Sequence, residues 1–321
     1  MIDRSPLTTA SGLGLGVLRQ RINVMSEELA SGKAADTGAA LRGDFSRLSE
    51  LRHGAALDRA HLEAMRTLGT WGEAGQTAIG RLDAGLAGLA EHALSADRPE
   101  GLGALAREAK ATMGDMLGAL SVRVAGRAVF AGGTDGKMPL PDAPTLISAA
   151  SAAAAGAADI DQVTERMTAF FEPGGGFDAL LGDRPVASFP TGEGRLDFPL
   201  DPGSDGLRAA LRAAVTLAIL PETGAADAAP ATLGSAVITG VTGARAALAA
   251  DAGRLGAVEA RAAQRLEALE SGLLNAERKE AELLAVDPFE TASRLQDEMS
   301  RLETSYAVVA RLGRLRLTDY L

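Results

Sequence analysis

Apolar residues recur at alternating spacings of three and four positions near both ends of the chain. The N-terminal row is Leu15, Leu18, Ile22, Met25 and Leu29, and the C-terminal row is Leu295, Met299, Leu302, Tyr306 and Val309. This spacing is typical of a coiled-coil seam and differs from the broader apolar stripe of a globular helix. We therefore predict two terminal helices whose seams pack on each other or on neighbouring copies of the chain.

The same periodicity and its end signals predict the boundaries of the helices. Gly32 follows the first helix at the position where a left-handed residue is expected. Before the last helix, Asp287, Pro288 and Glu290 occupy the N-cap, first and third helical positions, which is a strong start signal. Residues 1–11 lack periodicity and predict an irregular start. The predicted helices span residues 12–31, 44–95, 100–129, 233–284 and 288–321.

The middle of the chain has a different composition. Stretches rich in Gly and Pro at 132–146 and 221–230 predict linkers around it. Within it we predict helices over 149–168 and 207–220 and two short strands over 186–189 and 195–200. The predicted fold is mainly α: the N- and C-terminal segments, 1–135 and 233–321, form a long antiparallel helical bundle or coiled coil. Residues 136–232 form a small inserted mixed α/β module.

Composition narrows the functional classes. The chain has 321 residues, a net charge of −10 and no cysteine. The absence of cysteine excludes disulfides, thiol catalysis and Cys-ligated zinc. No basic face is concentrated in the sequence, so we expect no nucleic-acid partner. The first residues lack the apolar region of a cleaved signal peptide, and no apolar run has the length of a membrane span, so we expect no membrane partner.

Residue patterns that carry chemistry are weak throughout the chain. His53 and His61 lie eight positions apart on one predicted helix, whereas metal ligands on a helix are expected three or four positions apart. The glycines of 12–16 do not form a dinucleotide-binding fingerprint, and Gly174–Gly176 lacks the Lys of a phosphate-binding loop. We therefore predict no catalytic, cofactor-binding or metal-binding residues and no enzymatic activity.

Three short motifs resemble the flagellin family. Leu29, Ser31, Gly32, Lys33 and Asp36 match its N-terminal motif, which closes the first helix before an Asp-containing loop. Phe130 and Gly132 resemble a signature that follows the third helix in its hook–filament junction proteins. The ending Asp319-Tyr320-Leu321 is similar to the last residues of those proteins.

This resemblance implies a structural subunit of the bacterial flagellum that joins the hook to the filament. Such a subunit is exported through the flagellar type III apparatus without a cleaved signal peptide and becomes extracellular. Its implied partners are a hook-associated protein, flagellin, further copies of itself in a ring, and an export chaperone. The alternatives are a flagellin proper, which builds the filament, and a soluble coiled-coil interaction protein or chaperone.

Overall fold

The computed structural model describes residues 6–95, 99–131, 140–182, 184–224 and 230–318. Its contacts divide the chain into two compact units, one formed by residues 1–57 with 271–321 and the other by residues 58–270. Almost all regular structure is helical, and the described strands form two small two-stranded sheets. The predicted fold class, a mainly α bundle with a small mixed insertion, is confirmed.

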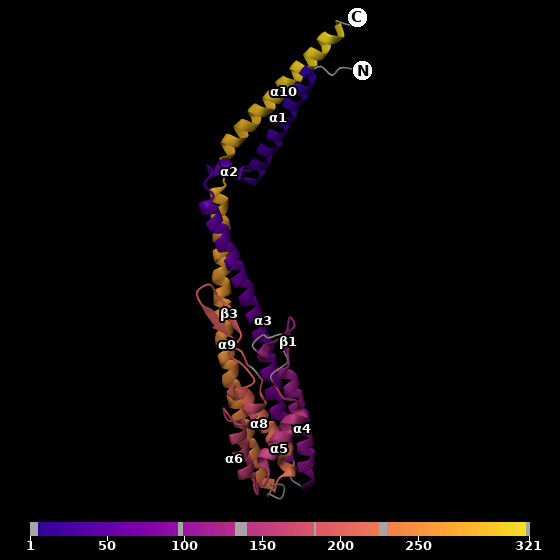
Figure 1. Cartoon of the computed structure of the whole chain (residues 1–321), viewed down its shortest axis with the longest axis vertical. Coiled ribbons are helices and arrows are strands. Elements are labelled where there is room, and N and C mark those ends of the chain that lie inside the picture. The colour runs from indigo at the N-terminus through magenta and orange to yellow at the C-terminus, as the bar shows by residue number, and fades with distance from the viewer. Residues whose placement is uncertain (1–5, 96–98, 132–139, 183, 225–229, 319–321) are drawn as a thin grey trace. The chain divides into compact units, whose positions relative to one another are not determined.

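The first unit pairs the two ends of the chain. Helices α1 (Pro6–Ser31) and α10 (Pro288–Thr318) lie side by side and antiparallel (Figure 1). Between them in sequence the unit contains α2 (Thr37–Ala40), the start of α3 (Ser46–Ser95) and the end of α9 (Pro230–Leu283). The expectation of an irregular start is wrong for residues 6–11, because α1 begins at Pro6, whose fixed φ suits the first turn of a helix.

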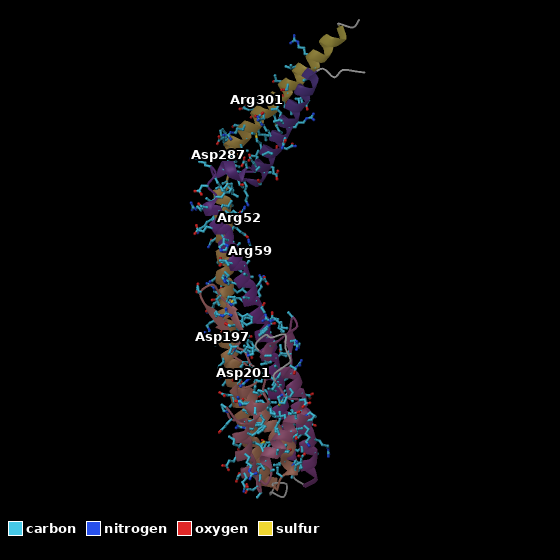
Figure 2. All side chains as sticks on the ribbon, viewed as in Figure 1. Arg52, Arg59, Asp197, Asp201, Asp287 and Arg301 are labelled. Carbon is cyan, nitrogen blue, oxygen red and sulfur yellow. The ribbon has the colours of Figure 1, made fainter. Side chains whose placement is uncertain are left out.

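The start of α10 follows the predicted capping pattern. The Asp287 carboxylate accepts hydrogen bonds from the N–H groups of Phe289 at 2.8 Å and Glu290 at 3.3 Å. Asp287 is labelled where α10 begins in Figure 2. These bonds satisfy N–H groups that the helix itself leaves unpaired.

A short backbone pairing, which we call the loop clasp, joins residues 32–34 to residues 284–286. The Ala34 N–H donates to the Leu284 carbonyl at 2.8 Å, and the Val286 N–H donates to the Gly32 carbonyl at 3.1 Å. Gly32 has φ +69°, the left-handed conformation that the sequence predicts there. The loop clasp therefore ties the end of α1 to the junction between α9 and α10.

The second unit contains the remaining helices and both hairpins. Its helices are most of α3 and α9 together with α4 (Pro99–Leu120), α5 (Ala143–Ala154), α6 (Ile160–Phe171), α7 (Gly176–Leu180), α8 (Asp205–Ile219) and the short 3-10 helices η1 (Val129–Ala131) and η2 (Leu220–Glu222). Its antiparallel hairpins are β1 (Arg123–Val124) with β2 (Arg127–Ala128), and β3 (Ser188–Pro190) with β4 (Arg195–Asp197).

One predicted helix ends earlier than expected, and another is divided into two helices. The helix predicted to reach residue 129 stops at Leu120, because Ala125 and Gly126 both have positive φ and turn the chain into the β1–β2 hairpin. The helix predicted over 149–168 is two helices, α5 and α6, separated around Gly156, whose φ is +76°. Both breaks depend on left-handed residues, which helical periodicity does not report.

Aromatic residues of the middle segment pack on helices outside it. Trp71 of α3 is 1% exposed, and the Phe189 and Phe198 rings meet its indole edge-on at 5.4 and 5.7 Å between centroids. Phe198 also lies 6.3 Å from Phe130. The middle segment therefore shares its core with α3. The predicted boundaries at 136 and 232 stay a prediction, since the compact units divide at other positions.

A buried carboxylate fastens α8 to α9. Asp251 of α9 is 1% exposed, and it accepts hydrogen bonds from the Gly206 N–H at 3.0 Å and from Arg254 at 2.5 Å. A Cβ on Gly206 would lie 2.6 Å from Asp251 Oδ2 and 2.7 Å from the Ala247 carbonyl oxygen, so only glycine allows this approach. Burial raises the pKa of the Asp251 carboxyl above its ordinary value, although Arg254 opposes the shift.

We expect Asp251 to weaken the fold as the pH rises. Because its folded pKa lies above the ordinary value of 3.8, its contribution to the free energy of unfolding is complete below that value and is lost as the pH rises through the folded pKa. Denaturant unfolding between about pH 3.5 and 7 measures the effect. The free energy of unfolding of Asp251→Asn should rise relative to that of the wild type as the pH increases.

Asp83 provides the matched control of opposite sign. The hydrogen bond from Arg245 lowers the Asp83 pKa, so its contribution is present above the ordinary value of 3.8 and is lost as the pH falls. Asp83→Asn should therefore lose stability relative to the wild type with rising pH, although the effect is small because the pair is partly solvated. If the stability difference between variant and wild type changed with pH in the same direction for both variants, the opposite pKa shifts of Asp251 and Asp83 would be contradicted.

Candidate assembly surface on helices α1 and α10

The predicted N-terminal row lies along the contact between α1 and α10. Leu15, Leu18, Ile22 and Met25 are half-buried, and Leu29 at the end of α1 is more exposed. Helix α10 contacts this row from one side and leaves the other side uncovered. These side chains therefore keep part of their apolar surface in contact with solvent.

The C-terminal row is only partly turned toward α1. Leu295 and Leu302 are half-buried, whereas Met299 is 48% exposed and Tyr306 and Val309 are also exposed. The face of α10 that is least exposed runs instead through Thr291, Leu295, Glu298, Leu302 and Ser305. That row keeps the spacing of four and three but includes three polar residues. The role of the predicted rows as an interface with other subunits stays a prediction.

Exposed apolar side chains lie on both helices, and we call Val17 and Val24 on α1 with Met299 and Tyr306 on α10 the outer stripe. The pair Val17 and Val24 and the pair Met299 and Tyr306 are each seven positions apart, so each pair stays on one side of its helix. Exposed apolar side chains that gather on one face mark interaction sites. The outer stripe is therefore a candidate surface for further helices.

Near the free ends, α1 and α10 leave a gap of about 340 Å³, lined by Gly14, Leu15, Leu18, Thr304, Ser305, Val308 and Val309. Beside it the Arg19 side chain donates a hydrogen bond from Nε to the Tyr306 hydroxyl at 2.8 Å, and its guanidinium lies 5.5 Å from the centroid of the Tyr306 ring. Arg19 thus holds Tyr306 at the edge of the pair. The packing between α1 and α10 is therefore open next to Tyr306.

The motif residues at the end of α1 build the turn and the loop clasp. The Lys33 N–H donates to Ser31 Oγ at 3.3 Å, and Lys33 itself pairs with Ala285. Asp36 caps α2 by accepting a hydrogen bond from the Ala39 N–H at 3.0 Å. The structure therefore gives Ser31, Gly32, Lys33 and Asp36 local roles in ending one helix and starting the next.

The other motif residues lie elsewhere or outside the described residues. Phe130 is fully buried in η1, against Phe198. Gly132 and the three terminal residues Asp319, Tyr320 and Leu321 fall outside the described part of the chain. Sequence reasoning missed Glu298, which is buried in the row facing α1, because the search followed apolar residues only. Extending the spacing through polar positions would have found it.

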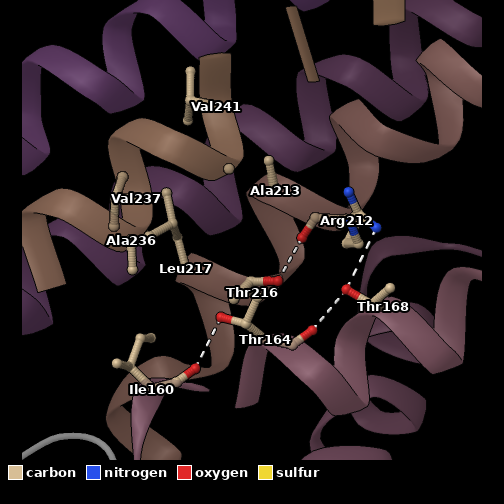
Figure 3. A pocket seen from close by; sticks show the side chains of 11 residues that line it. Ile160, Thr164, Thr168, Arg212, Ala213, Thr216, Leu217, Ala236, Val237 and Val241 are labelled. Carbon is tan, nitrogen blue, oxygen red and sulfur yellow. Dashed lines mark hydrogen bonds between the residues drawn. The ribbon is translucent and has the colours of Figure 1, made fainter. Parts of the chain in front are cut away.

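A cavity of about 80 Å³ lies between α6, α8 and α9 (Figure 3). The hydroxyls of Thr164, Thr168 and Thr216 in its lining donate to carbonyls of their own helices. Of the described residues that line it, Arg212 alone is ionisable. The cavity therefore offers a small, largely apolar space with no acid–base pair.

Among the described residues, no group of three or more His, Asp and Glu side chains is placed to hold a metal ion. His61 Nδ1 is enclosed without a hydrogen-bond partner. Over the same part of the chain, no helix combines the length and the apolar character that crossing a bilayer requires.

Comparison with known proteins gives a match in the region that contains α10. Residues 238–321 match the family described as the bacterial flagellin C-terminal helical region, and no curated protein matches the chain. The matched residues are about a quarter of the sequence and include most of α9 and all of the described α10. Flagellins are structural proteins of the extracellular flagellum that associate with other axial subunits. Residues 238–321 are therefore similar to the C-terminal helical region of these structural flagellar subunits.

Proposed function

We propose that the chain is a flagellar structural subunit that joins the hook to the filament by coiled-coil packing of its terminal helices. The observation that carries this proposal is the α1–α10 pair, which leaves the outer stripe exposed, and α10 lies within the flagellin match. Covering that stripe with helices of neighbouring subunits removes apolar surface from water, at about 25 cal/mol for each Å². Assembly therefore has a driving force that a single copy lacks.

The motifs favour the junction over the filament. Phe130 with Gly132 and the ending Asp319-Tyr320-Leu321 resemble junction proteins of the family. The partners are then a hook-associated protein on one side, flagellin on the other and further copies in a ring. Export follows the flagellar type III route with a chaperone.

Location on the flagellum tests the proposal. The chain has no cysteine, so Val186→Cys, at a position that is 64% exposed in the second unit, introduces a single thiol for a maleimide dye. We expect one fluorescent focus between hook and filament, from a small number of copies. Label along the whole filament would identify a flagellin instead. Flagella without label, from cells that express the protein, would contradict both roles.

The contribution of the terminal helices is tested by adding a charge. Leu302→Asp places a carboxylate at a half-buried apolar position, where an unpaired charge is costly. In the labelled background we expect the focus to disappear, while residues 58–270 keep the melting temperature of the parent. The control Glu303→Asp changes the exposed neighbour and should leave the focus intact. Normal assembly of Leu302→Asp would show that this face of α10 is not needed.

A further inference from the structure

Glu298 is a buried acid in the middle of an otherwise weakly covered helix pair. The residue is 7% exposed, and it lies on α10 between Leu295 and Leu302 on the face toward α1. Its Oε1 lies 3.7 Å from Arg21 of α1 and 3.3 Å from Arg301, which is labelled on α10 in Figure 2. Its Oε2 is enclosed and has no hydrogen-bond partner.

Burial of this carboxylate costs free energy that the ion pairs offset only in part. Arg21 and Arg301 are themselves 60% and 69% exposed, so their attraction is screened by water. A leucine at this position would continue the apolar seam. Polar residues in coiled-coil seams lower stability but specify the alignment of the helices. Glu298 can therefore distinguish one alignment of the two helices from another.

Apolar seams alone do not define the alignment of α1 against α10. Leu15, Ile22 and Leu29 repeat every seven residues on α1, and Leu295, Leu302 and Val309 do so on α10. Sliding one helix by seven residues, about 10 Å, places apolar rows against each other again. The loop clasp opposes sliding at one end of the pair, but the other end is open around the 340 Å³ gap.

The charges on α1 differ at the three alignments. In the observed alignment Glu298 lies against Arg21. Because the helices are antiparallel, a slide of seven residues in one direction places Glu298 against Glu28, and a slide in the other direction places it against Gly14. The first alternative brings two carboxylates together, and the second removes the cation that α1 supplies and leaves Glu298 with Arg301 of its own helix. Both therefore cost more than the observed alignment.

We propose that Glu298 sets the register of the α1–α10 pair, by attraction to Arg21 in the observed alignment and by repulsion from Glu28 in a shifted one. Glu298 is a positioning residue in this role. The register is a property of two helices within one chain. The register role of Glu298 can therefore fail while the flagellar role holds, and the flagellar role can fail while Glu298 still sets the register.

Engineered cysteine pairs in the cysteine-free chain report the register. Leu18→Cys with Ser305→Cys reports the observed alignment, because both residues line the same gap and the neighbouring Arg19 and Tyr306 are in contact. Met25→Cys with Ser305→Cys reports the alignment that brings Glu298 to Glu28. In the observed alignment the second pair is offset by about 10 Å, beyond the reach of a disulfide. Oxidation of dilute monomer followed by denaturing electrophoresis measures the linked fraction of each pair.

The informative variant is Glu298→Arg, which repels Arg21 in the observed register and attracts Glu28 in the shifted one. We expect the Met25–Ser305 cysteine link to rise at least about fivefold, which corresponds to ~1 kcal/mol of register preference. Adding Glu28→Gln, which keeps the oxygen that accepts from the Ala35 N–H, should return most of the link to the parent level. Glu303→Arg, on the exposed side, should leave both links unchanged.

Glu298→Leu keeps the proposal testable if Glu298→Arg loses helix by circular dichroism. It removes the charge and extends the apolar seam, so we expect the Met25–Ser305 cysteine link to rise about twofold or more while helix content is retained. An unchanged shifted link in a variant with native helix content would overturn the proposal. In that case the loop clasp alone fixes the register.

Discussion

Replacing Phe198 with alanine is expected to lower the free energy of unfolding of residues 58–270 by about 3–5 kcal/mol. The ring is 4% exposed and lies edge-on to Trp71 and Phe130, so its removal leaves a cavity at the point where α3 meets the middle segment. Chemical denaturation monitored by far-ultraviolet circular dichroism measures the loss.

The chain contains a single tryptophan, so the fluorescence of Trp71 gives a local readout of the same site. In Phe198→Ala we expect its emission to shift to the red, because water reaches the indole. The matched control is Val186→Ala in the same segment, where the side chain is largely exposed and the change should stay within about 0.5 kcal/mol. Equal stability of the two variants would mean that the middle segment does not share the α3 core.

Replacing Gly206 with alanine is expected to separate α8 from α9. The new Cβ would lie 2.6 Å from Asp251 Oδ2 and 2.7 Å from the Ala247 carbonyl oxygen, and a backbone atom cannot move aside as a flexible side chain can. Overpacking costs about 1–3 kcal/mol. Weakening the hydrogen bond between the Gly206 N–H and the buried carboxylate adds about 1–3 kcal/mol.

Gly114 provides a matched control for this substitution. It lies inside α4, and a Cβ there meets nothing within 4 Å. Because alanine favours a helix over glycine, Gly114→Ala should stabilise the chain by about 0.5–1 kcal/mol. Thermal unfolding of both variants separates the two outcomes. A stabilised Gly206→Ala would show that α8 and α9 are not held at this distance.

Features that depend on neighbouring residues in sequence could be predicted. The cap at Asp287 and the left-handed Gly32 are correct because each depends on a few adjacent residues. The two terminal rows also lie on the helices that the sequence predicts. Local capping and periodicity carry that information without reference to the rest of the fold.

Features that depend on contacts across the chain could not be predicted. The buried face of α10 passes through Glu298 in place of Met299, because the choice of face depends on how α1 approaches and Arg21 lies on α1. The approach of Gly206 to Asp251 joins residues 45 positions apart. Periodicity within one helix contains no information about either partner.

The loop clasp has a consequence for the order of folding. It pairs Ala34 with Leu284, so forming it first would require closure of a very long loop, at an entropic cost that grows with loop length. Within residues 58–270, the ion pair between Arg66 and Glu270 already brings distant parts of α3 and α9 together. Once those residues have folded, the chain left to close the loop clasp is far shorter. Pairing of the two chain ends should therefore follow the folding of residues 58–270.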